Sequence, residues 1–281
     1  MQEQYITEQS IRAFRLALLS DERAAGTIEN YLRHLRQFAA FLDARPANRE
    51  AAALWKEDLI AHGYCPSSVN AILAAVNKYF SFMEWQDCRV KPLRLQKKLF
   101  REERRELSRS EYNRLVETAQ SQGDVRLALL LEAICATGVR VSEVQYLTVE
   151  AAQAGKAVIS LKGKVRTILI SGKLAKKLLR YAHKNKIASG EIFRTRSGKA
   201  VSRKQIWAEM KALSAKAGIA ASKGFPHNLR HLFARTFHKV CRDVTQLADV
   251  LGHSSIETTR IYLMTTGAEH ARQLERLGLI S

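Results

Sequence analysis

The sequence predicts a mainly α-helical protein with two domains. Apolar residues recur at helical spacing over most of the 281-residue chain. Only two neighbouring runs, AVISL and RTILI, are β-branched and consistent with strands. Residues 91–107 are dense in charge and lack apolar periodicity, which is typical of a linker. We therefore expect a helical domain over residues 1–90, a basic linker over 91–107 and a second domain over 108–281.

Charge indicates the class of partner. The chain has 46 Lys and Arg residues against 27 Asp and Glu, which gives a formal net charge of +19. Solubility alone rarely needs so one-sided a balance, so we expect a polyanionic partner, with nucleic acid ahead of an anionic membrane face. Apolar residues make up 46% of the chain, which is enough to form a hydrophobic core.

The sequence also restricts the compartment. No stretch approaches the ~20 uninterrupted apolar residues of a membrane-spanning helix. The N-terminal MQEQYITEQSIRAF is polar and lacks the apolar middle of a signal peptide. The four cysteines are far apart and form no CxxC pair, so we expect neither a disulfide framework nor a zinc site. These features predict a cytoplasmic, nucleoid-associated protein with no membrane contact.

Four helices are expected in the first domain. Residues 8–43 form two helices separated by the turn DERAAG, residues 47–61 form a third, and apolar spacing from Val69 to Met83 marks a fourth. The expected N-caps are Thr27 for the second helix and Ser67 or Ser68 for the fourth.

The second domain opens with helices that carry clear end signals. Ser108 followed by Glu111 resembles a capping box and opens a helix at about 109–120. The apolar run DVRLALLLEAICAT is closed by Gly138, a common left-handed terminator. A short helix is expected at about 142–150.

The period then changes to that of strands. AVISL and RTILI, joined by residues 162–165, predict an antiparallel hairpin. Helices resume afterwards, and Pro226 stands at the first position of FPHNLRHLFARTFHKV. Ser254 and Glu257 resemble a second capping box. The remaining expected helices are 172–184, 202–217, 243–251 ending at Gly252, one that carries Tyr262, and the amphipathic tail GAEHARQLERLGLI.

Residue types suited to phosphoryl transfer gather in this second domain. His227 and Arg230 lie three residues apart in the first turn of a helix, where free N–H groups and the dipole favour anions. His253 stands at a helix start, and Arg140 follows Gly138 at a helix junction. A lysine of the hairpin turn can reach the same place.

Together with Tyr262 these residues form a coherent chemical set. Arginines neutralise charge on a pentavalent phosphorus, a lysine donates a proton to the leaving oxygen, and a tyrosine attacks to form a covalent phosphate ester. This chemistry requires no metal, and the sequence has no Asp/Glu cluster suited to Mg²⁺. A lone tyrosine on an apolar helix is more often a core residue, so the hypothesis depends on the combination.

Three segments resemble the motifs of the tyrosine recombinases, the phage-integrase and Xer-type family. ATGVRVSEV resembles the first arginine box, HNLRHLFA the HxLRH box, and LGHSSIETTRIYL the box with the nucleophile, all in family order. The resemblance covers the whole chain, because TIENYLRHLRQFAAFL is similar to a segment of the family's helical, SAM-like core-binding domain.

The resemblance implies a role for each matching residue. Arg140 and Arg230 would hold the phosphate, His227 would act in acid/base chemistry and orientation, His253 would donate a hydrogen bond in the transition state, and Tyr262 would be the nucleophile. His231 would have a structural or supporting role, and Glu143 would brace the site.

The hairpin lysine has two candidates. The family's hairpin commonly reads GKGxKxR, whereas this chain has LKGKVRT, which is one residue shorter. Keeping the lysine before a glycine selects Lys162, and keeping its spacing from Arg140 selects Lys164. We favour Lys162.

The resemblance implies a C-shaped clamp of two mostly helical lobes around duplex DNA. It implies a site-specific recombinase that cleaves one strand at a time through a 3′-phosphotyrosyl bond, without ATP, metal or another cofactor. It also implies a homotetramer on two DNA sites with short inverted repeats, with the tail helix packing on a neighbouring subunit. Integration, excision, inversion and dimer resolution are not distinguished by the sequence.

Two alternatives remain at this stage. A type IB topoisomerase or a hairpin telomere resolvase shares the chemistry, but the short chain and the Xer-like first domain argue against both. A catalytically inactive, sequence-specific DNA-binding protein on an integrase scaffold is the other, and the intact set of site residues argues against it.

Overall fold

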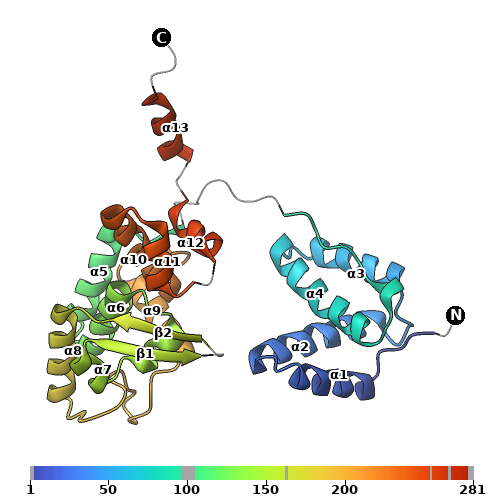
Figure 1. The fold of residues 1–281 in the computed structure, drawn as a ribbon, viewed down its shortest axis with the longest axis horizontal. Coiled ribbons are helices and arrows are strands. Elements are labelled where there is room, and N and C mark those ends of the chain that lie inside the picture. The colour runs from blue at the N-terminus through green and yellow to red at the C-terminus, as the bar shows by residue number, and fades with distance from the viewer. Residues whose placement is uncertain (1–2, 96–104, 162–163, 254, 265–266, 278–281) are drawn as a thin grey trace. The chain divides into compact units, whose positions relative to one another are not determined.

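The computed structural model describes residues 3–95, 105–161, 164–253, 255–264 and 267–277. The chain divides into two compact units, residues 1–97 and 98–281, each with its own hydrophobic core (Figure 1). Both units are mainly helical, and the strands of the described residues form one small antiparallel sheet. The predicted fold class, mainly α with two domains and a small β element, is confirmed.

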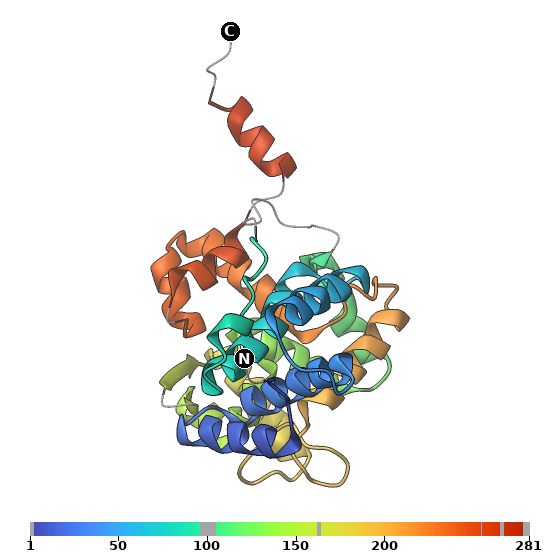
Figure 2. The ribbon, with the colours of Figure 1, turned by 90° about the vertical axis from the view of Figure 1, so that its right-hand side faces the viewer.

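Four helices build the first unit. Their bounds are α1 Glu8–Ser20, α2 Ala25–Leu42, α3 Arg49–Ala61 and α4 Pro66–Phe82, followed by the short 3₁₀ helix η1 Gln86–Cys88. Helix α1 contacts α2, α3 contacts α4, and α2 also contacts α4 (Figures 1 and 2). Apolar residues three and four apart face the centre. There the ring of Phe38 lies 4.8 Å from that of Trp55 and 5.9 Å from that of Phe80, centroid to centroid.

Two predicted helix starts in this unit are wrong. Helix α2 has Ala24 as its N-cap and no side-chain cap hydrogen bond, so Thr27 lies inside its first turn. Helix α4 has Cys65 as its N-cap and begins at Pro66, ahead of the two serines that were expected to cap it. Proline fits the first helical position because the N–H it lacks would have no partner there.

Two asparagines of α4 hold the chain that leaves the first unit. The side chain of Asn77 donates to Val90 O at 2.9 Å and accepts from Val90 N at 3.1 Å. Asn70 does the same with Leu93, at 2.9 and 2.7 Å. Each amide satisfies both backbone groups of one residue, as a neighbouring strand would. The extended chain is therefore fixed to α4 as far as Leu93.

The second unit carries the remaining elements. They are α5 Arg109–Ser121, α6 Val125–Thr137, the 3₁₀ helix η3 Val141–Tyr146, α7 Val149–Ala154, β1 Lys156–Leu161, β2 Lys164–Leu169, α8 Gly172–Lys184, α9 Arg203–Lys216, α10 Pro226–Cys241, α11 Val244–Leu251, α12 Ile256–Leu263 and α13 Gly267–Glu275. The capping box of Ser108 and Glu111 is confirmed, as are the left-handed terminators Gly138 and Gly252.

The single short helix predicted at 142–150 is wrong. Two elements occupy this stretch, η3 and α7. Thr148 separates them because its backbone is extended, and its hydroxyl caps α7 by accepting from Ala151 N at 3.1 Å. Leu147, immediately before it, is fully buried and anchors the break in the core.

The predicted hairpin is confirmed: β1 ends where the run AVISL ends, and β2 begins two residues closer to the turn than the run RTILI does. Strands β1 and β2 pair antiparallel from Lys156↔Leu169 to Leu161↔Lys164. On one face Ile159 and Ile168 are buried, whereas Val165 on the other face is exposed. This alternation matches the two-residue period of a strand with one face on the core.

Helix α10 is fastened to the segment that precedes α5. The side chain of Asn228 donates to Arg105 O at 2.7 Å, and Arg235 donates to Leu107 O at 2.8 Å and pairs with Glu106. These contacts hold α10, the helix that carries several residues of the candidate site, in place. Within the described ranges no helix combines the length and apolar character needed to cross a membrane.

Candidate active site

Four elements of the second unit meet around Tyr262. Helix α10 begins at Pro226, so His227, Arg230 and His231 emerge from its first two turns. Helix α11 ends at the left-handed Gly252, and the chain then turns into α12, which carries Tyr262. Helix α10 contacts α6, α11 and α12, and Arg140, which follows the end of α6, is the N-cap residue of η3.

Arg230 is the buried centre of this site, with 1% of its surface exposed. Its guanidinium donates to Gly138 O and, through Nη2, to Leu251 O at 2.8 Å. These carbonyls lie at the ends of α6 and α11, where helical carbonyls lack partners within the helix. Burial lowers the pKa of Arg230, the side chains of Tyr262 and Glu143 oppose that shift, and the charge of Arg140 adds to it.

The orientation of His253 follows from its two neighbours. Nη2 of Arg230 lies 2.9 Å from Nε2 of His253, and Nδ1 of the ring lies 2.8 Å from Oγ1 of Thr259. An arginine can only donate, so Nε2 of the neutral ring is the acceptor and the ring proton is on Nδ1, which donates to Thr259. Thr259 is fully buried.

Tyr262 lies among three imidazoles and is 6% exposed. The centroid of its ring is 4.5 Å from that of His231, 5.6 Å from that of His253 and 6.1 Å from that of His227. The rings of His253 and Tyr262 are nearly parallel, with 13° between their planes. The rings of His227 and His231 meet edge to face, with their centroids 4.6 Å apart.

All three histidines are neutral at pH 7. Burial is the main cause: it lowers the pKa of His231 to about 3, that of His253 to about 4, and also that of His227. The positive charge of Arg230 acts in the same direction on each of them. A neutral imidazole can accept a proton from a reacting group, which a charged one cannot.

Arg140 is the accessible guanidinium of the site. Its Nη1 donates to Oε1 of Glu143 at 2.9 Å, and its backbone N donates to Oε2 at 2.9 Å. The side chain of Glu143 is 4% exposed, whereas that of Arg140 is 40% exposed. A buried carboxylate thus holds a cation that stays open to an approaching anion.

Sequence reasoning missed a third guanidinium, that of Arg166 on β2. Its side chain lies 3.4 Å from Glu143 and donates to Leu251 O. A signal was present in the strand pattern: Arg166 shares its parity with the buried Ile168 and Ile170, between the exposed Val165 and Thr167. An arginine at an inward position of a half-buried strand requires a buried partner.

Two residues of the predicted site and caps lie outside the part of the chain that the structure describes. Lys162 and Ser254 lie outside the described residues, and only the backbone of Lys164, in β2, is described. The capping box predicted at Ser254 and Glu257 is wrong in position. Helix α12 has Ser255 as its N-cap, without a side-chain cap bond, so Glu257 is not its third residue.

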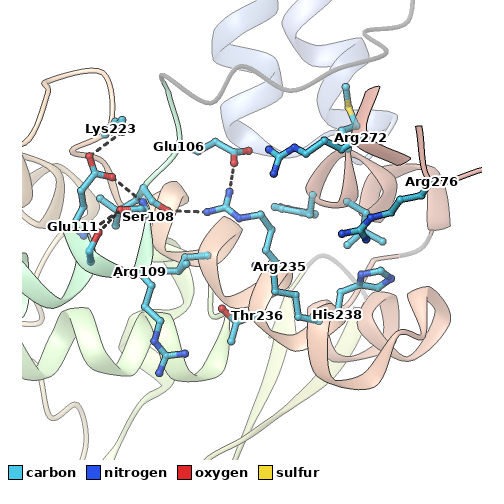
Figure 3. Close-up of a pocket in the computed structure, with 17 residues that line it drawn as sticks. Glu106, Ser108, Arg109, Glu111, Lys223, Arg235, Thr236, His238, Arg272 and Arg276 are labelled. Atoms are coloured by element: carbon cyan, nitrogen blue, oxygen red, sulfur yellow. Dashed lines mark hydrogen bonds and ion pairs between the residues drawn. The ribbon is translucent and has the colours of Figure 1, made fainter. Parts of the chain in front are cut away.

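A cavity of about 830 Å³ adjoins Tyr262. It lies beside α5 and α10, and it is also lined by Arg272 of α13 and by Arg276, which follows the end of that helix (Figure 3). Its wall carries the ion pairs Lys223–Glu111, at 2.8 Å, and Arg235–Glu106. As for metals, the described parts of the chain contain no group of three or more His, Cys, Asp or Glu residues able to hold an ion.

Two family profiles match the chain. Residues 11–87 match the phage integrase N-terminal SAM-like domain, and residues 105–269 match the phage integrase family. The second match alone covers more than half of the chain. The chain belongs to the phage integrase family.

Within this family the chain is similar to Xer tyrosine recombinases over nearly its whole length. It is 28% identical over 289 residues to tyrosine recombinase XerA of Pyrococcus furiosus, covering 100% of this chain and 98% of that protein. It is 30% identical over 280 residues to tyrosine recombinase XerD of Brucella abortus biovar 1, covering 88% and 90%.

The fold of this integrase-family chain is also that of solved relatives. A lambda integrase tetramer bound to a Holliday junction superimposes with a TM-score of 0.74 at 16% identity, over 92% of this chain and 77% of that chain. The Xer-like tyrosine recombinase family that the motifs indicate is therefore confirmed, and so is its two-domain fold.

Proposed function

We propose that this protein is a site-specific DNA recombinase that cuts and rejoins strands through Tyr262. The observation that carries the proposal is the convergence of Tyr262 with Arg140, Arg230, His227 and His253 in one site. Membership of the tyrosine recombinase family supports the same reaction class.

In the proposed reaction the hydroxyl of Tyr262 attacks the phosphorus of a scissile phosphodiester. The new bond joins Tyr262 Oη to a 3′-phosphate, and the bond to the 5′-oxygen breaks. In this proposal His227, which is neutral at pH 7, takes the tyrosine proton, and Lys162 gives a proton to the departing 5′-oxygen. The 5′-hydroxyl of a partner strand then reverses the attack, so the phosphodiester energy is kept in the covalent link.

The arginines stabilise the charge that builds up on phosphorus. Arg140 is open to solvent and fixed by Glu143, which suits the first contact with a phosphate. Arg230 is held by two helix-end carbonyls and has little freedom to reorganise. Fixed donors that face developing charge in a site that excludes water are the strongest single source of rate enhancement.

His253 must change its hydrogen bonding to serve as a donor. In the free protein Nε2 accepts from Arg230. A bound phosphate supplies negative charge and competes for the arginine, which raises the pKa of the ring and favours a proton on Nε2. The expected donor is thus formed when the substrate arrives.

Duplex DNA is the proposed partner. The net charge of +19 favours contacts to backbone phosphates, which reward Lys and Arg without regard to sequence. We propose that the domain at 1–90 and the catalytic domain at 108–281, joined by the basic linker at 91–107, grip opposite sides of one core site. Short inverted repeats are the expected target.

Assembly as a homotetramer on two DNA sites completes the proposal. A fold relative is a lambda integrase tetramer on a Holliday junction. Arg272 of α13 lines the cavity beside Tyr262, so a tail helix packing on a neighbouring subunit can influence the nucleophile.

Covalent capture tests the function. The chain is incubated with nicked duplexes tiled from the DNA that flanks its own gene, and with duplexes it retains from a random-sequence pool, then denatured. We expect a protein–DNA adduct that Tyr262→Phe abolishes and Tyr181→Phe, at a partly buried tyrosine of the same unit, leaves intact. Retained duplexes that never form an adduct would instead identify a sequence-specific DNA-binding protein without catalytic activity.

A further inference from the structure

Arg166 is an arginine at a core-facing position of a short hairpin. It pairs with Ile159 across the β1–β2 ladder, and directly opposed residues share a face. Only 9% of its side chain is exposed. Burying a guanidinium is costly unless it is paired, so its contacts need an explanation.

Arg166 contacts two groups that also bind the arginines of the proposed mechanism. The carboxylate of Glu143 lies 3.4 Å from Nη2 of Arg166 and also accepts from Arg140. The carbonyl oxygen of Leu251 accepts from Arg166 and also from Arg230. Arg166 thus contacts both the carboxylate that holds Arg140 and the carbonyl oxygen that holds Arg230.

The backbone beside His253 is shaped around the same side chain. Gly252 has a positive φ of 62°, and a Cβ added there would lie 2.3 Å from Cδ of Arg166. The glycine therefore leaves room for Arg166 at the point where α11 ends and the chain turns to His253. The side chain of Arg166 therefore packs directly against the turn that leads to His253.

The charge of Arg166 is balanced in part. Burial lowers its pKa to about 10, Glu143 opposes that shift, and Arg230 and Arg140 add to it. Its Nε and Nη2 have no hydrogen-bond acceptor among the described residues. Arg166 is cationic at neutral pH and adds to the positive potential around Tyr262 without itself being open to solvent.

We propose that Arg166 is a positioning residue that fixes Arg140, Arg230 and His253 relative to Tyr262 by bridging Glu143 and the end of α11. The proposal rests on the proposed function for its effect on the reaction, and on geometry alone for its effect on His253.

The first arm of the test separates binding from chemistry. Arg166→Gln and Arg166→Lys are compared with Thr167→Ala, at the next residue on the exposed face of the same strand. On a nicked duplex that the wild type cleaves, Arg166→Gln should lower the rate of adduct formation at saturating protein by about 100-fold, since small misplacements of reacting groups have effects of that size. Its affinity for the duplex should stay within a few-fold, Arg166→Lys should recover part of the rate, and Thr167→Ala should match the wild type.

The second arm needs no DNA. Burial is the main cause of the low pKa of His253, the charges of Arg230, Arg140, Arg166 and His227 lower it further, and its Nδ1 is bound to Thr259. The full chain, with histidines labelled at Cε1, is titrated by NMR, and the His253 signal is identified by its loss in His253→Asn. Arg166→Gln should raise the His253 midpoint above about 4, because one of the charges that lower it is removed, whereas Thr167→Ala should not.

The two arms distinguish the two hypotheses. A wild type that never forms a Tyr262-dependent adduct, together with a raised His253 midpoint in Arg166→Gln, would remove the proposed function and keep the arrangement. Adduct formation at the wild-type rate by Arg166→Gln would overturn the positioning role. An unchanged His253 midpoint in that variant would overturn it as well.

Discussion

At the scale of single residues, the imidazole of His253 is held by one hydroxyl. Thr259 accepts the Nδ1 proton inside the protein, and this bond leaves Nε2 facing Arg230. Loss of the hydroxyl leaves a buried N–H without a partner and frees the ring to rotate. The site should therefore be sensitive to a change that alters neither charge nor volume.

Thr259→Val tests this dependence. We expect adduct formation to slow by about 10- to 100-fold, the effect typical of losing a group that orients a functional histidine, with DNA affinity preserved. Thr258→Val, at the exposed neighbouring threonine, is the matched control and should behave as the wild type. Equal rates for the two variants would show that Thr259 does not orient the ring.

His231 links the site to pH. Its native pKa of about 3 lies below the ordinary 6.5, so between these values the unfolded chain binds a proton that the native chain does not. The stability of the second unit is therefore undiminished above pH 6.5 and declines as the pH falls toward 3. In urea unfolding, His231→Gln should show a shallower decline, by up to about one proton per molecule. Parallel pH profiles would contradict this.

Individual site residues were predictable where a motif marks them. Arg140, His227, Arg230, His253 and Tyr262 were named from the sequence, and the structure brings them together. Arg166 was missed because its role depends on hairpin register and on contacts 23 and 85 residues away along the chain, with Glu143 and Leu251. Contacts between residues so far apart along the chain leave no periodic pattern in the sequence.

At the scale of elements, the end of α11 packs so closely against Arg166 of the hairpin that a side chain at Gly252 would overlap with it. Gly252 and Gly155 both have positive φ, of 62° and 68°, but a Cβ at Gly155 would meet nothing closer than 3.8 Å. Comparing substitutions at the two glycines therefore distinguishes the cost of the left-handed backbone, which both share, from the cost of overlap with Arg166, which only Gly252 has.

Gly252→Ala should destabilise the second unit more than Gly155→Ala does. The left-handed backbone costs about 1–2 kcal/mol in either variant. Overlap with Arg166 adds about 1–3 kcal/mol in Gly252→Ala alone. Thermal unfolding measures both, and combining Gly252→Ala with Arg166→Ala should remove the excess. An excess that persists in the double variant would mean that another group causes it.

Several helix ends were predicted from local signals, although the equally local signals at Thr27 and at Ser254 with Glu257 were wrong. The box of Ser108 and Glu111 and the terminators Gly138 and Gly252 lie within a few residues of the ends they set. The start of α4 was missed because Pro66 begins a helix without a side-chain cap, which overrides the hydroxyls that follow it.

At the scale of the whole molecule, each unit has a core of its own. The buried apolar residues of the first unit form one cluster, and those of the second unit form others. Two blocks of helical periodicity separated by a charged stretch predicted this division, and the boundaries 1–90 and 108–281 remain predictions. Cores that share no residues are expected to melt as separate cooperative units.

Calorimetry tests this separation. Phe38→Ala, in the first core, should lower one of two transitions by the equivalent of about 3–5 kcal/mol and leave the other in place. Leu130→Ala, at a fully buried leucine of the second core, should have the converse effect. A single transition that moves with either substitution would show that the units fold as one.

The hold of α4 on the outgoing chain has a consequence for length. Asn70 and Asn77 are seven residues apart, which along a helix is a rise of about 10.5 Å. Their partners, Val90 and Leu93, are three residues apart in extended chain, which spans about 10 Å. The two spacings are nearly equal, so the pairing with α4 fixes how many residues of extended chain lie between Val90 and Leu93. One residue inserted between Val90 and Leu93 would break this register, whereas the same insertion beyond Leu93 would only lengthen the tether between the units.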